Sequence, residues 1–233
     1  MAAMNETRKL AAILVADIVG YSRLAGADED RILARLRTLR SDLIDPIVSV
    51  HHGRVVKRTG DGGIIEFRSV VAAVRCAIEI QDGLAQRNAG VPADRRIEYR
   101  VGIHLGDVVE EEDGDLMGDG VNIAARLEGV AKPGAICLSE DAYRQVKARL
   151  DLKVSDLGPT RLKNIAEPMN VYCVEVGLPA QTEPTRQGAA SSSGAAAALG
   201  RVSWRPMVLG GALAIGMFVA GVYAPRSSSP IAP

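Results

Sequence analysis

The stretch from residue 55 to residue 67 constrains the fold of this chain more than any other. Two short runs rich in β-branched residues flank a Gly-Asp-Gly-Gly sequence at positions 60–63. This pattern predicts a β-hairpin with a tight turn. The turn carries one acidic side chain, Asp61, which the hairpin would present at a fixed point.

A second acid, Asp17, lies within the apolar run at residues 11–19. The run is too short for a helix and continuous enough for a buried central strand. A charge inside such a strand is costly unless another group pairs with it. If the strand lies beside the hairpin, Asp17 and Asp61 meet at one end of the sheet. There they could share hard cations such as Mg²⁺ or Mn²⁺, which prefer oxygen ligands.

The composition indicates a small-molecule ligand rather than a nucleic acid. The 233 residues carry no net formal charge, and only 3% of them are aromatic. A balanced charge provides no polycationic surface for phosphate backbones, and few aromatic residues are available to stack on bases. The length allows one ordinary domain and an appendage.

Cys76, Cys137 and Cys173 are widely spaced, each in an apolar context, without His or Cys neighbours at metal-ligand spacing. We interpret all three as buried packing thiols in a reducing compartment. His104 lies within an apolar strand pattern and is predicted to be a packed, hydrogen-bonded core residue rather than a ligand.

The order of predicted elements indicates an α+β fold. A strand at residues 10–17 precedes an amphipathic helix at 28–50, bent at Pro46, and then come the hairpin, a helix that begins after Ser69, and a strand at 99–111. This βαββαβ order is the ferredoxin-like split βαβ arrangement, an antiparallel sheet with helices on one face. A helix from Asp119, a strand at 135–138, a helix at 139–150 and strands near 152–155 and 171–176 would follow.

The chain divides into five predicted segments: an N-terminal tail at residues 1–8, a domain at 9–176, a linker at 177–206, a membrane span at 207–224 and a tail at 225–233. The first tail lacks the apolar core of a signal peptide, and the linker is rich in Ala, Ser, Gly, Pro and Gln.

Residues 207–224 are uncharged and would extend about 27 Å as a helix, enough for a bilayer core. A buried core helix is the alternative. More arginines precede this segment than follow it, which favours a single-pass protein of the cell membrane with its large domain in the cytoplasm.

Four segments together resemble the catalytic domain of class III nucleotidyl cyclases. They are residues 15–22, 57–62, 100–106 and 115–126, and residues 162–165 are similar to the closing part of the same family. The resemblance covers residues 8–176. It implies an enzyme that converts ATP or GTP to a 3′,5′-cyclic nucleotide and pyrophosphate at sites formed between two catalytic domains.

The resemblance also implies roles for individual residues. Asp17 and Asp61 would hold two metal ions, Mg²⁺ or Mn²⁺, with the backbone carbonyl of Ile18 completing the metal shell. Asn122 would orient the ribose. Arg126, which is four residues further along the same helix, would stabilise charge on the α-phosphoryl oxygens.

Lys57 and Asp115 occupy the family positions that read the nucleobase. A lysine only donates hydrogen bonds and an ionised aspartate only accepts them, so the pair suits the N1 acceptor and N6 donor of adenine. Guanylate cyclases typically carry Glu and a small polar residue at these positions. The sequence therefore favours ATP as substrate and an adenylate cyclase as the function.

The family draws its metal ligands from one subunit and its base-reading residues from the other. Since this chain contains both sets, we expect a homodimer with two equivalent sites. Two alternatives stay open: a catalytically silent nucleotide-binding regulatory module, and a guanylate cyclase. The intact Asp17, Asp61, Asn122 and Arg126 argue against the first, and Lys57 with Asp115 argues against the second.

Overall fold

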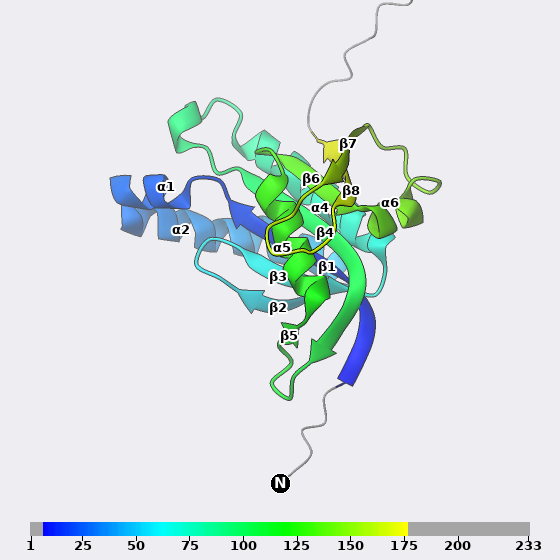
Figure 1. The fold of residues 1–233 in the computed structure, drawn as a ribbon. Coiled ribbons are helices and arrows are strands. Elements are labelled where there is room, and N and C mark those ends of the chain that lie inside the picture. The colour runs from blue at the N-terminus through cyan, green and yellow to red at the C-terminus, as the bar shows by residue number, and fades with distance from the viewer. Residues whose placement is uncertain (1–6, 177–233) are drawn as a thin grey trace, which may run out of the picture. The chain divides into compact units, whose positions relative to one another are not determined.

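A computed structural model describes residues 7–176 of the chain. These residues form one mixed β-sheet with helices on both faces (Figure 1). The strands are β1 (Thr7–Ile18), β2 (Arg54–Arg58), β3 (Gly63–Phe67), β4 (Tyr99–Glu110), β5 (Leu116–Met117), β6 (Ala135–Ser139), β7 (Val154–Thr160) and β8 (Met169–Glu175). The helices are α1 (Tyr21–Ala27), α2 (Glu29–Leu39), α3 (Asp45–Val50), α4 (Val70–Arg87), α5 (Asp119–Val130) and α6 (Glu140–Val146).

The strand order in the sheet is β2-β3-β1-β4-β6-β8-β7, and β5 pairs with β4. The first four of these strands pair antiparallel, with helices between β1 and β2 and between β3 and β4. This arrangement confirms the predicted βαββαβ core and the additional C-terminal strands and helix. The prediction of an antiparallel sheet was wrong at one point, because β6 pairs parallel to β4. The chain reaches β6 through α5, and a helical crossover of this kind returns the chain in the same direction.

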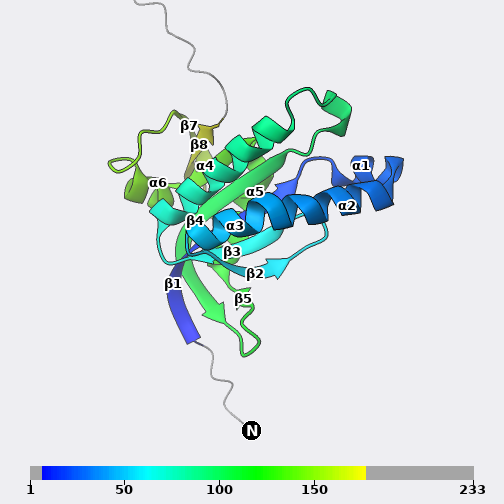
Figure 2. The same cartoon turned by 180° about the vertical axis from the view of Figure 1, so that it is seen from behind.

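The central strand β1 is buried on both faces. Ala12 and Leu14 pack in the main core with α2, α3 and α4, whereas Ala11 and Ile13 pack on the opposite face near α5. Figure 2 shows α2, α3 and α4 on one side of the sheet, and Figure 1 shows α5 on the other. Burial of successive residues explains why this strand is a continuous apolar run rather than an alternating one. The helices predicted on one face of the sheet are α2, α3 and α4, and α5 covers the opposite face.

The helix predicted at residues 28–50 is interrupted. A π-helical turn at Arg40–Ile44 separates α2 from α3, and the N–H of Asp45 donates to the carbonyl of Arg40, five residues earlier. Pro46 follows at the start of α3. Proline has no N–H to donate, and its ring conflicts with the carbonyl four residues earlier, so a regular α-helix cannot continue through this position. The wider π turn accommodates the proline, at the position where the sequence predicted a bend.

The β2–β3 turn approaches the end of β1 very closely. In the sheet register, Ala16 on β1 lies opposite Gly63. A Cβ atom at Gly62 would lie only 2.1 Å from the carbonyl oxygen of Ala16. Glycine at this position therefore lets the turn that carries Asp61 reach the strand that carries Asp17.

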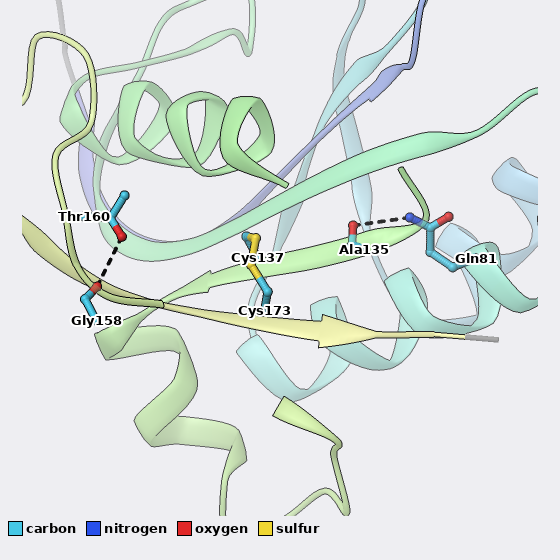
Figure 3. The surroundings of a disulfide bond; sticks show 6 residues. All are labelled: Gln81, Ala135, Cys137, Gly158, Thr160 and Cys173. Atoms are coloured by element: carbon cyan, nitrogen blue, oxygen red, sulfur yellow. Dashed lines mark hydrogen bonds between the residues drawn. A yellow bond between two sulfur atoms is a disulfide. The ribbon is translucent and has the colours of Figure 1, made fainter. Parts of the chain in front are cut away.

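The cysteine prediction was wrong for two of the three residues. Cys137 on β6 lies directly opposite Cys173 on β8, and the two form a disulfide (Figure 3). They are 36 residues apart in sequence, whereas their Cα atoms are 4.2 Å apart. Only the pairing of β6 with β8 brings them together, so their spacing could not reveal the bond. Cys76 is a free, buried thiol, as predicted.

The predicted linker at 177–206, membrane span at 207–224 and tail at 225–233 lie outside the described residues. Between Thr7 and Val176, no helix is both long enough and apolar enough to cross a membrane.

The disulfide predicts the number of titratable thiols. If the protein is purified without a reducing agent, unfolded and titrated with a thiol reagent, we expect one thiol per chain, from Cys76. The same titration after reduction should detect all three cysteines. Three thiols before reduction would contradict the pairing of Cys137 with Cys173.

The close approach at Gly62 predicts a marked loss of stability in Gly62→Ala, because the added methyl group would overlap the Ala16 carbonyl. We expect the free energy of unfolding in urea to fall by about 1–3 kcal/mol, the usual cost of overpacking. Gly60→Ala is the matched control, since a Cβ at Gly60 meets nothing within 4 Å. Equal stability of the two variants would contradict the proposed approach.

Candidate active site

The structure brings the two predicted acids together. Asp17 is the penultimate residue of β1, and Asp61 lies in the turn between β2 and β3. Burial of the Asp17 carboxyl raises its pKa above the ordinary value, and the neighbouring Asp61 carboxylate raises the pKa further. Two adjacent carboxylates repel each other, and a divalent cation between them would relieve that repulsion.

The turn that carries Asp61 is held from outside by Arg40. Its guanidinium Nη2 donates to the carbonyl oxygens of Thr59 and Gly60, at 3.1 and 2.9 Å. Within the turn, the N–H of Gly62 donates to Thr59 Oγ1 at 2.9 Å. Arg40 is the first residue of the π-helical turn. The side chain of Arg40 therefore connects the π-helical turn to the turn that carries Asp61.

Two residues beside Asp17 had no role in the sequence-based site. Arg100 lies opposite Asp17 in the β1–β4 register, and its Nη2 is 3.2 Å from Asp17 Oδ2. Its Nε lies 2.8 Å from Oε1 of Glu128 on α5, at ion-pair distance but without hydrogen-bond alignment. Glu128 is only 9% exposed, and burial raises the pKa of its carboxyl. Arg100 thus provides the positive charge for two acids in a confined space.

A signal for Arg100 was present in the sequence. It opens the segment at residues 100–106, where a permanently charged residue begins a run that is otherwise mostly apolar. The charge indicates a buried or half-buried partner. The identity of that partner depends on the pairing of β1 with β4, which the spacing of the residues does not show.

The acidic pair fits a hard divalent cation. Mg²⁺ is commonly held by one or two carboxylates together with substrate phosphates, and main-chain carbonyls can add to the set. Asp17 and Asp61 supply the carboxylates, and the main chain of Ile18, whose side chain is buried, adjoins Asp17. In the part of the chain that the structure describes, no group of three or more His, Cys, Asp or Glu side chains could hold a metal ion.

Lys57 and Asp115 also come together. Lys57 Nζ on β2 donates to Asp115 Oδ2 in the β4–β5 turn at 2.5 Å. This hydrogen bond lowers the pKa of Asp115 and raises the pKa of Lys57, because it stabilises the charged form of each group. The second carboxylate oxygen of Asp115 accepts the N–H of Leu116 at 2.9 Å. The pair is open to solvent, with 55% of the Lys57 side chain exposed.

Asn122 and Arg126 lie one turn apart on α5, as their spacing predicted. Asn122 is exposed and Arg126 is half-buried. The helix packs very closely on β4, because a Cβ at Gly102 would lie 2.2 Å from the carbonyl oxygen of Ala124. This contact fixes the height of both polar side chains above the sheet. No hydrogen bond or ion pair within residues 7–176 joins either of them to Asp17 or Asp61.

His104 is a core residue. It is 6% exposed, and its Nδ1 lies 2.8 Å from Ser139 Oγ in a buried hydrogen bond. Burial lowers the pKa of its imidazole. The prediction of a packed, hydrogen-bonded histidine is confirmed.

Comparisons with known proteins show which family this fold belongs to. The chain is 45% identical over 172 residues to "Putative adenylate cyclase 3" of Rhizobium meliloti (strain 1021), an alignment that covers 74% of this chain and 29% of that relative. The crystal structure titled "Adenylate/Guanylate Cyclase/Hydrolase" from Silicibacter pomeroyi is 44% identical, with a TM-score of 0.67, and covers 72% of this chain and 98% of that chain. The adenylyl cyclase CyaB from P. aeruginosa, 23% identical with a TM-score of 0.65 over 75% of this chain and 98% of its own, supports the fold alone.

The chain spans less than a third of the length of the first curated relatives it matches. A family model described as the adenylate and guanylate cyclase catalytic domain matches residues 4–176. This match covers most of the chain, and the likeness to the relatives runs over the same region. The chain therefore belongs to the family of adenylate and guanylate cyclase catalytic domains.

Proposed function

We propose that the chain is an adenylate cyclase, which converts ATP to 3′,5′-cyclic AMP and pyrophosphate. The observation that carries this proposal is the direct contact between Lys57 and Asp115 in a cyclase catalytic domain. The adjacent Asp17 and Asp61 carboxylates support an active enzyme rather than a silent module. The name of the relative from Rhizobium meliloti also points to an adenylate cyclase.

The Lys57–Asp115 pair matches adenine in its hydrogen-bonding pattern. The ammonium of Lys57 can donate to adenine N1, and the carboxylate of Asp115 can accept from the N6 amino group. Guanine presents the reverse pattern on this edge and would leave both charged groups facing like partners. A site built to hydrogen-bond one base discriminates strongly against another, because the mismatched polar groups stay unpaired.

The remaining residues are assigned to the phosphate chemistry. Asp17 and Asp61, with the carbonyl of Ile18, would hold two divalent cations, Mg²⁺ or Mn²⁺. When bound, such cations lower the pKa of the ribose 3′-hydroxyl and neutralise the triphosphate. Asn122 orients the ribose so that its 3′-oxygen attacks the α-phosphorus while the bond to pyrophosphate breaks. Arg126 stabilises the charge on the α-phosphoryl oxygens with a planar, permanently charged guanidinium.

We also propose that the active sites form in a homodimer. The acidic pair and the base-reading pair lie in separate clusters within one protomer, and no hydrogen bond or ion pair among residues 7–176 joins them. A two-fold dimer would place the acids of one protomer against Lys57, Asp115, Asn122 and Arg126 of its partner, twice over. Formation of the dimer would then bring together, around one ATP molecule, the groups that act on it.

Membrane anchoring remains a prediction from the sequence. The uncharged stretch at residues 207–224 supports a single span, and the arginines before it favour a cytoplasmic catalytic domain in the cell membrane. A role in cyclic AMP signal transduction would follow from these assignments.

The proposal predicts that the full chain forms cyclic AMP when supplied with ATP and Mn²⁺ or Mg²⁺. We expect kcat/KM for ATP to exceed that for GTP by about 10-fold or more, because Lys57 and Asp115 match only adenine. Asp61→Ala should reduce turnover by about 100-fold or more, since it removes a cation ligand. Preference for GTP would favour a guanylate cyclase, and absence of either product would favour the silent module.

The dimer predicts complementation between two inactive variants. Asp61→Ala damages the acidic half of a site and Asn122→Ala the other half, so a mixed dimer keeps one intact site. With random mixing, about a quarter of wild-type activity should return, because half of the dimers are mixed and each has one of two sites. Asp17→Ala mixed with Asp61→Ala is the control and should recover nothing. Failure of the first mixture to recover would show that one protomer holds a complete site.

A further inference from the structure

We propose that Arg54 is a positioning residue for nucleobase recognition. It holds the β4–β5 turn against β2 and thereby fixes Asp115 opposite Lys57. The inference rests on the proposed function, because it concerns the two residues that are assigned to the base. In this proposal Arg54 contacts neither the base nor the phosphates, yet it contributes to the preference for ATP over GTP by positioning Asp115.

The guanidinium of Arg54 connects three elements. Its Nη1 donates to the carbonyl oxygen of Gly114 at 2.8 Å, and Gly114 immediately precedes Asp115. Its Nε donates to Glu66 Oε2 on β3 at 2.7 Å. Its Nη2 lies 2.6 Å from Oε2 of Glu66 and 2.9 Å from Oε1 of Glu110, the last residue of β4, at ion-pair distance but without hydrogen-bond alignment. The hydrogen bond to Glu66 and the charges of the two acids therefore orient the planar guanidinium, and its Nη1 points to the turn.

An irregularity in β2 directs Arg54 and Lys57 to the same side of the sheet. Residues three apart on a regular strand face opposite sides. Here Arg54 lies opposite Glu66 whereas Lys57 lies opposite Ile64, so β2 contains one extra residue, Val56, relative to β3. Glu66 and Ile64 are two apart and share a face. The bulge thus aims two cations of one strand at a single turn.

The turn needs an external contact because its composition opposes order. It contains four acidic residues within five positions, at 111–113 and 115. Short internal bonds shape it: the N–H of Glu111 donates to the Asp115 carbonyl at 3.0 Å, and the N–H of Asp115 donates to Asp113 Oδ1 at 2.9 Å. The pairing of β4 with β5 ties the two ends of the turn to the sheet, but these bonds do not connect its middle to a neighbouring strand. Arg54 connects the turn to β2, and it also places a positive charge next to the like charges.

Lys57 cannot hold the turn by itself while the base is bound. Its contact with Asp115 is solvent-exposed, and exposed ion pairs contribute little stability. Both groups must also turn to the base when adenine enters between them. The bond from Arg54 to the Gly114 carbonyl uses neither group, so it persists through base binding. Loss of Arg54 should therefore loosen Asp115 in the step where its position determines which base fits.

Kinetic constants separate this role from a general structural one. For Arg54→Met in the full chain, we expect KM for ATP to rise about 10-fold and the ATP-to-GTP ratio of kcat/KM to fall about 10-fold. We expect kcat to change less than about threefold, because Asn122 and Arg126 lie on a different element. Lys9→Met is the matched control. Lys9 Nζ contacts the same two acids, Glu66 at 2.6 Å and Glu110 at 2.7 Å.

Lys9→Met removes one positive charge from the same cluster and leaves the Gly114 bond in place, so its KM and ATP-to-GTP ratio should stay at the wild-type values. Arg54→Lys is the second variant, in case Arg54→Met does not fold. It keeps the charge, but a single ammonium cannot reach both Glu66 and Gly114 as the guanidinium does. We expect Arg54→Lys to lose discrimination as well. A wild-type ratio in Arg54→Lys, or an equal loss in Lys9→Met, would overturn the proposal.

Hydrogen exchange tests, independently of turnover, whether Arg54 holds the β4–β5 turn, a contact we call the Arg54 clamp. In the nucleotide-free full chain, the amides of Asp115 and Leu116 should exchange faster in Arg54→Lys than in wild type and in Lys9→Met. If the wild-type chain produces no cyclic nucleotide, the proposed function fails, yet the exchange rates still decide whether Arg54 holds the turn. Unchanged exchange in Arg54→Lys would overturn the clamp even in an active cyclase.

Discussion

The pairing of β1 along both of its edges is the constraint on which the rest of the structure depends. The strand bonds to β3 on one side and to β4 on the other, and its side chains are buried on both faces. Three of the candidate site residues are positioned by this strand. Asp17 is near its end, Arg100 lies opposite on β4, and the turn with Asp61 reaches it because Gly62 has no side chain. A buried strand has one permitted register, so these neighbours are set together.

Arginine side chains connect the segments that carry the candidate site. Arg40 donates to carbonyls of the β2–β3 turn, Arg54 to a carbonyl of the β4–β5 turn, and Arg100 lies between Asp17 and Glu128. A guanidinium suits this task because its donors spread in a plane and its charge is permanent. Each one ties a loop or a strand end to a regular element. The acids of the site are thereby placed by cations that themselves sit on helices and strands, which gives the loops a rigid support.

Much of the fold could be predicted because its elements have strong local signals. The run that contains Asp17, the Gly-rich turn at Asp61 and the four-residue spacing of Asn122 and Arg126 each depend on residues close in sequence. The family segments then assigned a role to each. Predictions failed where the outcome depended on distant partners. The parallel pairing of β6 with β4 is one case, and the disulfide between Cys137 and Cys173 is another.

The sequence by itself determined the order of most strands and helices, the candidate acids, and the chemistry of the Lys57–Asp115 pair, because these follow from local pattern and residue chemistry. Only the tertiary structure decided which charges compensate one another. Glu128 and Arg100 are 28 positions apart in numbering and meet because α5 packs closely on β4. Likewise, the bulge at Val56 turns Arg54 toward Gly114, and no periodicity in the sequence shows it. Such contacts arise from register and packing, which are properties of the assembled sheet rather than of any one segment.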